Sequence, residues 1–423
     1  MFDRAAAAGR DRISSCNLKS LFPQRNTFGA SGCYSSLVTE RQRDPIESSA
    51  VAVPTSEVRL AGSASAVLMQ PTTLCNLNCT YCYLPDRKQS KRMSVEVAEA
   101  VAAGVEEWSE QHPVTVVWHG GEPLAVDPAY FRALVRPFGP GAAHPITHAV
   151  QTNATRIDET WCEVFSDVPI RVTVSIDGPD EANDSRLDWS GRPSTARAMH
   201  GIDTLRRAGI SFSMIAVVSD LSPGSASRLF RFACELGCEN LGVNLAEKKG
   251  VYIGGQEPQT GVVAFWQELA ACWQADPRIH VRELDHAYTY IREELAGAAP
   301  QRAEHPIRPL PLVTWDGHYL PIGAELAGFR SPQHGEFTAG NVLETPLTVL
   351  AGRAGEVAWV AEALTGIANC RKQCEHFSYC RGGQVANKYF ETGRLDTTET
   401  AYCRTSKIDL LEGILRHAEH ART

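Results

Sequence analysis

The sequence predicts an α/β protein in which a parallel sheet forms a partial (β/α)6 barrel. Short apolar runs of strand-like composition recur six times, and stretches with helical spacing or helix-capping residues lie between them. Six strand–helix units are too few to close an eight-stranded barrel, so we expect an open one. The expected strands are 66–69, 114–118, 147–150, 170–174, 212–218 and 241–245.

Residues that favour helix ends support the helices between these strands. Ser94 is a suitable N-cap before an apolar pattern, and Gly209 and Gly237 are suitable C-terminal caps. Because the carboxyl ends of parallel strands share one rim, polar residues that follow different strands meet there. The expected helices begin after Ser94 and run over about 128–137, 158–166, 194–208 and 225–236.

The pattern divides the 423 residues into four parts. Residues 1–62 have little periodic apolar pattern and are rich in Ser, Ala, Arg and Gly, so we expect a poorly ordered N-terminal extension. The partial barrel covers 63–255, and a helical linker region covers 256–309. Residues 310–423 form a C-terminal domain that contains four spaced cysteines.

Composition excludes several classes of function. The net charge of −8 gives no basic footprint for nucleic acid, and no apolar run approaches the ~20 residues of a membrane span. No secretory signal is visible, so we expect a cytoplasmic protein. Seven of the thirteen cysteines fall into two spaced groups, which favours metal binding over disulfides.

The first cysteine group, Cys75, Cys79 and Cys82, follows the first expected strand with the spacing C-x3-C-x2-C. Three thiolates on one loop can hold three irons of a [4Fe–4S] cube and leave the fourth open to a ligand. A zinc knuckle is the alternative, but zinc usually takes four ligands and no fourth Cys or His lies nearby. The motif resembles that of the radical S-adenosylmethionine (SAM) enzymes. This resemblance implies a [4Fe–4S] cluster that binds SAM and yields a 5′-deoxyadenosyl radical.

Residues on later rim loops resemble the SAM-binding residues of that family. Gly120-Gly121-Glu122-Pro123 follows the second strand and resembles its GGEP motif, where glycines let the backbone approach a ligand closely. The resemblance implies that this loop and Glu122 receive the ammonium of SAM. It also implies cofactor contacts by Tyr81 (adenine), Asn153 (adenosine), Ser175 and Asp177 (ribose and carboxylate) and Arg186 (carboxylate). Simple packing of Tyr81 and a solvated Arg186 are the alternatives.

The second cysteine group resembles the SPASM domain of peptide-modifying radical SAM enzymes. That resemblance usually implies two auxiliary clusters, but Gln384 and Ile322 stand where two ligands of the first cluster are expected. The complete remaining set implies one auxiliary [4Fe–4S] cluster, with a structural zinc as the alternative. The four implied ligands are Cys370, Cys374, Cys380 and Cys403.

Residues 380–403 resemble the corresponding part of cyclophane-forming (triceptide-type) maturases of ribosomal peptides. The resemblance implies a peptide-modifying oxidoreductase that removes hydrogen from Cβ and joins that carbon to an aromatic side chain. It further implies a precursor peptide with a leader as substrate and an electron donor such as flavodoxin or ferredoxin. The alternatives are a thioether-forming or Cys/Ser-oxidising maturase, and a non-catalytic Fe–S or zinc binding protein.

Restoring aromaticity after such a cross-link requires the loss of one electron and one proton. A fully ligated cluster can take the electron, whereas the proton needs a base. Asp316 and Glu247 are the candidates because both lie on loops expected near the rim. Each also has a structural alternative as a capping carboxylate.

Overall fold

The computed structural model describes residues 58–420 except 140, 253, 255–259 and 299–302, so most of the expected N-terminal extension lies outside the described residues. A nine-stranded sheet organises the described chain, in the order β7-β6-β5-β4-β3-β2-β1-β8-β9. The six predicted strands are confirmed and lie side by side, all parallel, in register along the sheet. They are β1 (Ala66–Met69), β2 (Val114–Trp118), β3 (Ile146–Thr152), β4 (Ile170–Ser175), β5 (Phe212–Val218) and β6 (Asn240–Leu245).

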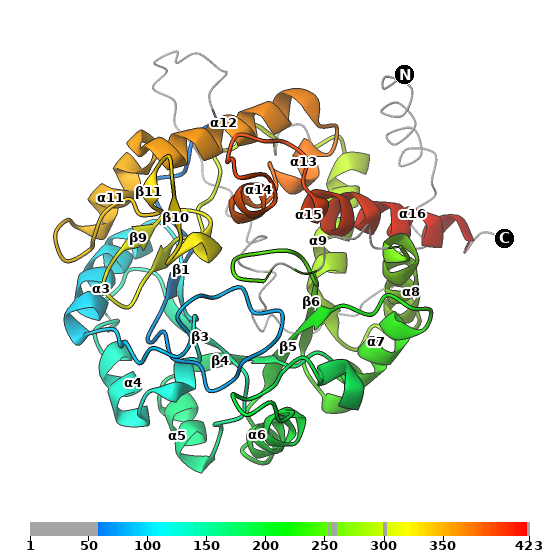
Figure 1. Ribbon diagram of the computed structural model, residues 1–423, viewed down its shortest axis with the longest axis horizontal. Helices are drawn as coiled ribbons and strands as arrows, with labels where there is room; N and C mark the ends of the chain where they lie inside the picture. The colour runs from blue at the N-terminus through cyan, green and yellow to red at the C-terminus, as the bar shows by residue number, and fades with distance from the viewer. Residues whose placement is uncertain (1–57, 140, 253, 255–259, 299–302, 421–423) are drawn as a thin grey trace.

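The predicted helices are also confirmed, and they lie outside the ring of strands (Figure 1). The Ser94 side chain accepts a hydrogen bond from the Val97 amide at the first helix, as an N-cap does. Gly237 ends another helix with φ of 75°, a conformation that glycine adopts without strain. These helices are α3 (Val95–Ser109), α4 (Pro128–Val135), α5 (Glu159–Asp167), α6 (Thr195–Arg207) and α7 (Ser225–Leu236).

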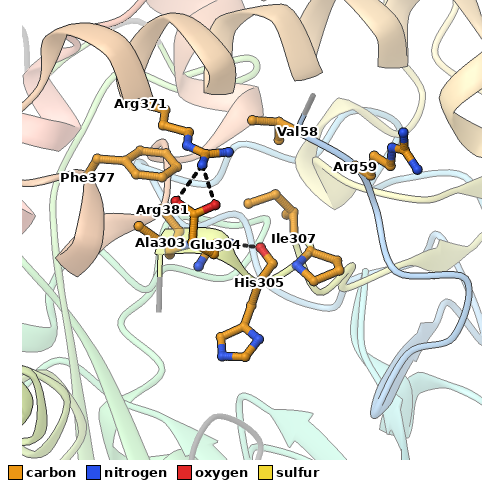
Figure 2. Close-up of a pocket in the computed structure, with 10 residues that line it drawn as sticks. Val58, Arg59, Ala303, Glu304, His305, Ile307, Arg371, Phe377 and Arg381 are labelled. Carbon is orange, nitrogen blue, oxygen red and sulfur yellow. Dashed lines mark hydrogen bonds and ion pairs between the residues drawn. The ribbon is translucent and has the colours of Figure 1, made fainter. Parts of the chain in front are cut away.

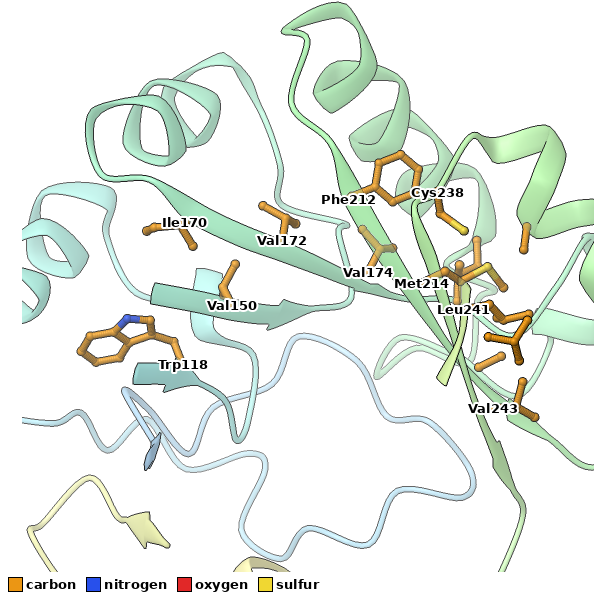
Figure 3. Close-up of a cluster of buried hydrophobic side chains, with 14 of the residues drawn as sticks. Trp118, Val150, Ile170, Val172, Val174, Phe212, Met214, Cys238, Leu241 and Val243 are labelled. Carbon is orange, nitrogen blue, oxygen red and sulfur yellow. The ribbon is translucent and has the colours of Figure 1, made fainter. Parts of the chain in front are cut away.

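Apolar side chains between the sheet and these helices form the main core. Val150, Val172 and Val174 point from neighbouring strands toward the covering helices (Figure 3). Trp118 is fully buried and packs edge-on against Phe131 of α4, with ring centroids 5.2 Å apart. The strands are buried because helices cover the sheet, which is typical of parallel sheets.

Short strands that the sequence pattern did not predict extend the sheet at both edges. β7 (His280–Val281) pairs with β6, and α8 (Val262–Ala275) and α9 (Arg282–Leu295) flank it in the chain. At the other edge, β8 (Leu312–Val313) is parallel to β1, and β9 (Tyr319–Leu320) is antiparallel to β8. The region after residue 310 therefore begins as a continuation of the barrel sheet.

The C-terminal region packs back onto the barrel through its last helix. The Trp266 indole of α8 donates a 2.9 Å hydrogen bond to the Thr405 carbonyl, just before α16 (Asp409–His420). Among the described residues, no helix is long and apolar enough to cross a membrane. The other elements are η2 (Pro123–Ala125), η3 (Asp180–Asn183), η4 (Ala324–Leu326), β10 (Arg330–Ser331), β11 (Gly335–Glu336), α11 (Leu347–Arg353), η5 (Ala354–Glu356), α12 (Ala358–Gln373), α13 (Phe377–Cys380), α14 (Val385–Thr392), α15 (Ala401–Cys403) and η6 (Arg404–Ile408).

Candidate functional site

The first cysteine group lies on the loop that follows β1, and all three thiols are half-buried. The Cys82 amide donates to the Cys79 carbonyl, and the Trp189 indole holds the Cys75 carbonyl at 2.8 Å. Burial raises the pKa of Cys75 above its ordinary range and that of Cys79 to about 11, and the neighbouring thiols of the group add to both shifts. A metal that binds these thiols displaces their protons.

Gly121 brings the loop after β2 into contact with the chain just before Cys75. Its φ is 61°, and a Cβ there would lie 2.6 Å from the Thr72 carbonyl oxygen and 2.7 Å from that of Leu74. The next amide, of Glu122, donates a 2.8 Å hydrogen bond to the same Leu74 carbonyl. Only glycine permits both this conformation and this approach.

Glu122 joins the loops after β2 and β3. One oxygen accepts from the Thr152 hydroxyl at 2.6 Å and from the Leu124 amide, and the other accepts from the Asn153 amide at 2.8 Å. The residue is 2 % exposed, and burial raises the pKa of its carboxyl. These contacts give Glu122 a positioning role, and its contact with the SAM ammonium stays a prediction.

Asn153 connects this part of the rim to the cysteine loop. Its amide nitrogen donates to the Asn76 side-chain oxygen at 2.9 Å and lies 4.0 Å from the Cys75 sulfur. Pro123 is buried where η2 begins, directly after Glu122. The predicted GGEP loop and Asn153 are thus brought together beside the first cysteine group.

Asp177, Arg186 and Tyr81 form a second cluster on the same rim. Asp177 accepts from the Arg186 guanidinium at 2.8 Å and from the Tyr81 hydroxyl at 2.5 Å. The Arg186–Asp177 pair is buried, with side-chain exposures of 8 % and 1 %. Burial lowers the pKa of Arg186, but the Asp177 carboxylate raises it further, so the guanidinium stays charged. Ser175 ends β4 and is half-buried, two residues before Asp177.

These residues fit SAM and an iron–sulfur cluster by their donor chemistry. Within the described residues, the buried Nε of Arg186 has no hydrogen-bond partner, so one donor remains for an added carboxylate. Three thiols on one loop supply three iron ligands. In the part of the chain that the structure describes, no three His, Cys, Asp or Glu side chains are already placed to hold a metal ion, and the ligand roles stay predictions.

The second cysteine group gathers in the C-terminal region around a buried lysine. Lys388 is fully buried, and its ammonium lies 3.4 Å from the Cys370 sulfur. A buried ammonium requires a nearby anion, and a thiolate satisfies it. Burial raises the pKa of Cys370 overall, and Lys388 opposes that rise. The Cys370 and Cys403 sulfurs lie 3.5 Å and 3.9 Å from the same Thr398 carbonyl oxygen, and the Cys374 amide donates a 2.8 Å hydrogen bond to the Cys370 carbonyl.

The two positions that lack an expected cysteine have other roles. Ile322 is buried in an apolar cluster with Leu320 and Val385. Gln384 accepts a hydrogen bond from the Lys249 ammonium at 3.2 Å and donates to the Tyr402 hydroxyl at 3.3 Å. Neither environment offers a thiolate for a metal.

The two candidate bases have different surroundings. Asp316 accepts from the Thr314 hydroxyl at 2.5 Å and pairs with His318, within the turn between β8 and β9. Burial raises the pKa of Asp316, but these neighbours lower it overall, as in a capping carboxylate. Glu247 lies two residues beyond β6 and contacts Lys249 and Asn387. Sequence reasoning missed Lys249 and Lys388, because no local pattern marks a lysine as buried.

A small cavity of about 150 Å³ lies beside the second cysteine group (Figure 2). Arg371 and Arg381, each next in sequence to a predicted ligand, line it. Arg371 is paired with Glu304 at 2.6 Å, and Arg381 donates to the His305 carbonyl. The cavity contains none of the predicted SAM-binding residues.

Comparisons with known proteins identify the family. Residues 69–233 match the model of the radical SAM superfamily. The uncharacterized protein sll1766 of Synechocystis sp. is 30 % identical over 364 residues, which are 81 % of this chain and 89 % of that protein. The chain belongs to the radical SAM superfamily. Membership implies SAM and a [4Fe–4S] cluster, in agreement with the donor set at the rim.

Named relatives and solved structures extend this result. The serine-type anaerobic sulfatase-maturating enzyme of Bacteroides thetaiotaomicron is 31 % identical over 183 residues, 41 % of this chain and 44 % of that enzyme. Native anSMEcpe with bound AdoMet superposes with a TM-score of 0.66 at 21 % identity, covering 84 % of this chain and 98 % of its own. Streptococcus suis SuiB bound to precursor peptide SuiA superposes with a TM-score of 0.58 at 15 % identity. This match covers 87 % of this chain and 85 % of the SuiB chain. The two structures share the fold of this radical SAM chain.

Proposed function

We propose that this chain is a radical SAM maturase that removes two hydrogens from a ribosomally made peptide, joining a Cβ carbon to an aromatic side chain. The observation that carries the radical SAM chemistry is the rim, where the three thiols, the GGEP loop and a buried guanidinium with one unused donor come together. The cyclophane product rests on the resemblance of residues 380–403 to cyclophane-forming maturases. The names of the relatives support a peptide or protein substrate, since they include a sulfatase-maturating enzyme.

We assign Cys75, Cys79 and Cys82 as cluster ligands and Arg186 as the partner of the SAM carboxylate. When bound, the cluster and SAM supply a 5′-deoxyadenosyl radical that can remove a hydrogen atom from carbon. Arg186 orients the cofactor because Asp177 fixes one side of its guanidinium and leaves the Nε donor free for a carboxylate. Glu122 keeps two rim loops together around this position.

We assign the four C-terminal cysteines to one auxiliary [4Fe–4S] cluster. Lys388 supports this assignment, because its fully buried ammonium lies 3.4 Å from the Cys370 sulfur and favours the thiolate form that a metal binds. The environments of Ile322 and Gln384 support the absence of a second auxiliary cluster. A fully ligated cluster stores or transfers electrons, and that role suits the oxidative step of the proposed reaction.

A Cys- or Ser-oxidising maturase is the second candidate. The serine-type sulfatase-maturating relative favours it, at 31 % identity over 183 residues. Cyclophane formation, thioether formation and oxidation of Ser or Cys at Cβ each remove two hydrogens from the peptide. A thioether-forming reaction also consumes a thiol but keeps the sulfur, whereas the thioaldehyde formed from Cys loses its sulfur when water converts it to an aldehyde. The reacting residue in the substrate therefore distinguishes the candidates.

The test uses the full chain, loaded anaerobically with iron and sulfide, with SAM and a chemical reductant or reduced flavodoxin. One synthetic peptide carries an aromatic residue two positions before a lysine and lacks Cys and Ser. A second carries a single Ser, a third carries a single Cys, and both lack aromatic residues. We expect 5′-deoxyadenosine and a first peptide that is lighter by two hydrogens, with a new carbon–carbon bond in its fragment ions.

Each outcome decides between the candidates. Conversion of the Ser of the second peptide or the Cys of the third to an aldehyde, with the first peptide unchanged, would support the Cys/Ser-oxidising maturase. A loaded wild-type chain that carries about eight irons but forms no 5′-deoxyadenosine would favour a non-catalytic Fe–S protein. Zinc in place of iron at the C-terminal cysteines would refute the auxiliary cluster.

A further inference from the structure

A charged network that no sequence motif marks lies where the barrel meets the C-terminal region. The Lys249 ammonium contacts Glu325 at 2.9 Å, Glu247 at 3.2 Å and the Gln384 side-chain oxygen at 3.2 Å. The other oxygen of Glu247 accepts from the Asn387 amide at 2.9 Å. The side chains of Lys249, Glu247 and Glu325 are 12–22 % exposed, so the network is mostly removed from water.

The network lies between the two cysteine groups. Lys249 is 5.6 Å from the ring of Tyr83, the residue after Cys82, and the Val251 amide donates to the Tyr83 carbonyl. On the other side, Gln384 donates to Tyr402, the residue before Cys403. The loop after β6 runs inward toward α14 and the cysteine loop (Figure 1). A group in this network is therefore close to the proposed radical source and to the proposed electron acceptor.

The surroundings separate the two carboxylates of the network. Burial raises the pKa of Glu325, but Lys249 lowers it overall, so Glu325 is the ion partner of the lysine. Burial raises the pKa of Glu247, and Lys249 and Asn387 only reduce that rise. Two carboxylates whose pKa values are moved apart suit different roles, one as a permanent charge and one as a proton acceptor.

We propose that Glu247 is the base that accepts the proton released when the substrate is oxidised, an inference that depends on the proposed function. In the cyclophane reaction, the Cβ–H hydrogen atom goes to the 5′-deoxyadenosyl radical, and the carbon radical then bonds to the aromatic ring. The adduct loses one electron to an acceptor of the iron–sulfur class and its ring C–H proton to a Glu247 carboxylate oxygen. Two C–H bonds break, one C–C bond forms, and the substrate loses two hydrogens.

Lys249 and Asn387 are positioning residues in this scheme. The Asn387 amide nitrogen and the Lys249 ammonium each hold one oxygen of Glu247, which fixes the plane of its carboxylate. Asn387 is fully buried, and its own side-chain oxygen has no hydrogen-bond partner among the described residues. Its orientation is set by Glu247, because a flipped amide would place two acceptors against each other.

The test compares Glu247→Gln with the wild type, and Asp316→Asn serves as the matched control at the other candidate carboxylate. The full chain, loaded with iron and sulfide, is given SAM, reductant and whichever synthetic peptide the wild type oxidises. For Glu247→Gln we expect 5′-deoxyadenosine within about twofold of wild type and modified peptide lower by about 100-fold or more, as for loss of a general base. Asp316→Asn should form as much 5′-deoxyadenosine and as much modified peptide as the wild type.

Two further measurements keep a structural role apart from a catalytic one. The peptide affinity and the thermal midpoint of Glu247→Gln should equal those of the wild type. The wild-type ratio of modified peptide to 5′-deoxyadenosine should fall as the pH falls through the raised pKa of Glu247, whose charged neighbours are Lys249 and Glu325. Glu247→Gln should lack this dependence.

Parallel loss of 5′-deoxyadenosine and modified peptide in Glu247→Gln would refute the inference, as would an unchanged ratio of the two. If only Asp316→Asn formed 5′-deoxyadenosine without modified peptide, Asp316 rather than Glu247 would be the base. A wild type that oxidises none of the peptides would instead refute the proposed function, and the inference with it.

Discussion

Replacement of Gly121 by alanine tests whether the rim depends on close contact between the GGEP loop and the cysteine loop. A left-handed conformation costs a residue with a Cβ about 1–2 kcal/mol. The added methyl would also lie 2.6 Å and 2.7 Å from two carbonyl oxygens, and such overpacking costs about 1–3 kcal/mol more. We expect Gly121→Ala to lower the free energy of unfolding by about 2–5 kcal/mol.

Gly209→Ala is the matched control. Gly209 has φ of 68°, nearly that of Gly121, but no heavy atom lies within 4 Å of the position of its Cβ. Gly209→Ala should therefore lower the free energy of unfolding only by the conformational cost of about 1–2 kcal/mol. Replacing glycine by alanine also restricts the unfolded chain, and this stabilising effect is the same for both variants. The difference in unfolding free energy between Gly121→Ala and Gly209→Ala therefore measures the cost of the close contact with the Thr72 and Leu74 carbonyls.

The assay is urea unfolding of the metal-free chain, followed by circular dichroism under reducing conditions. Gly121→Ala should also retain less iron after loading, because Cys75 directly follows the segment that must move. Equal unfolding free energies for the two alanine variants, within about 0.5 kcal/mol, would refute the argument from close approach. Normal iron content in Gly121→Ala would show that the cysteine loop is positioned by other contacts.

Three further predictions concern the buried charges and the cysteines. Replacing all of Cys75, Cys79 and Cys82 by serine should lower iron from about eight to about four per chain, and an unchanged count would contradict the ligand assignment. Arg186→Met should cost about 3–5 kcal/mol in denaturant unfolding, since it leaves Asp177 buried without its cation, and should weaken SAM binding. Lys388→Met should make the potential of the auxiliary cluster more negative, by on the order of 100 mV at an effective dielectric of about 20, because it removes a positive charge 3.4 Å from the sulfur of a predicted ligand, Cys370. An unchanged potential in a redox titration followed by electron paramagnetic resonance would oppose that role.

The sequence was sufficient to predict the six central strands and the rim that they form. Their apolar runs are long enough to show a pattern, and caps such as Ser94 and Gly237 mark the helices between them. β7, β8 and β9 have two residues each, which is too short for any periodicity. Their positions at the sheet edges depend on tertiary packing and could not be predicted from local pattern.

The candidate site was predictable where it rests on loops that follow strands. Asn153 and Asp177 lie on the expected rim because parallel topology brings strand ends together. The Lys249 network was not predictable, since it joins residues near 247, 325 and 387 that share no local motif. Lys388 resembles an ordinary surface lysine in the sequence, and its burial beside Cys370 depends on tertiary packing that no local pattern shows.

Two buried cations, Arg186 and Lys388, and the mostly buried Lys249 connect the parts of this site, and each contacts an anion or a thiol. Arg186 pairs with Asp177 at 2.8 Å, Lys249 with Glu325 at 2.9 Å, and Lys388 contacts Cys370 at 3.4 Å. Removing one member of a buried pair leaves an uncompensated charge, which costs far more than the pair itself contributes.

The same charges explain why the barrel and the C-terminal region must be arranged together. Glu325 belongs to the C-terminal region and Lys249 to the loop after β6, so their pairing fixes the position of Glu247 relative to the cysteine loop. Salt screens buried pairs much less than exposed ones. The coupling between 5′-deoxyadenosine formation and peptide oxidation should therefore change little between low and moderate ionic strength, even where the rate of peptide association does change.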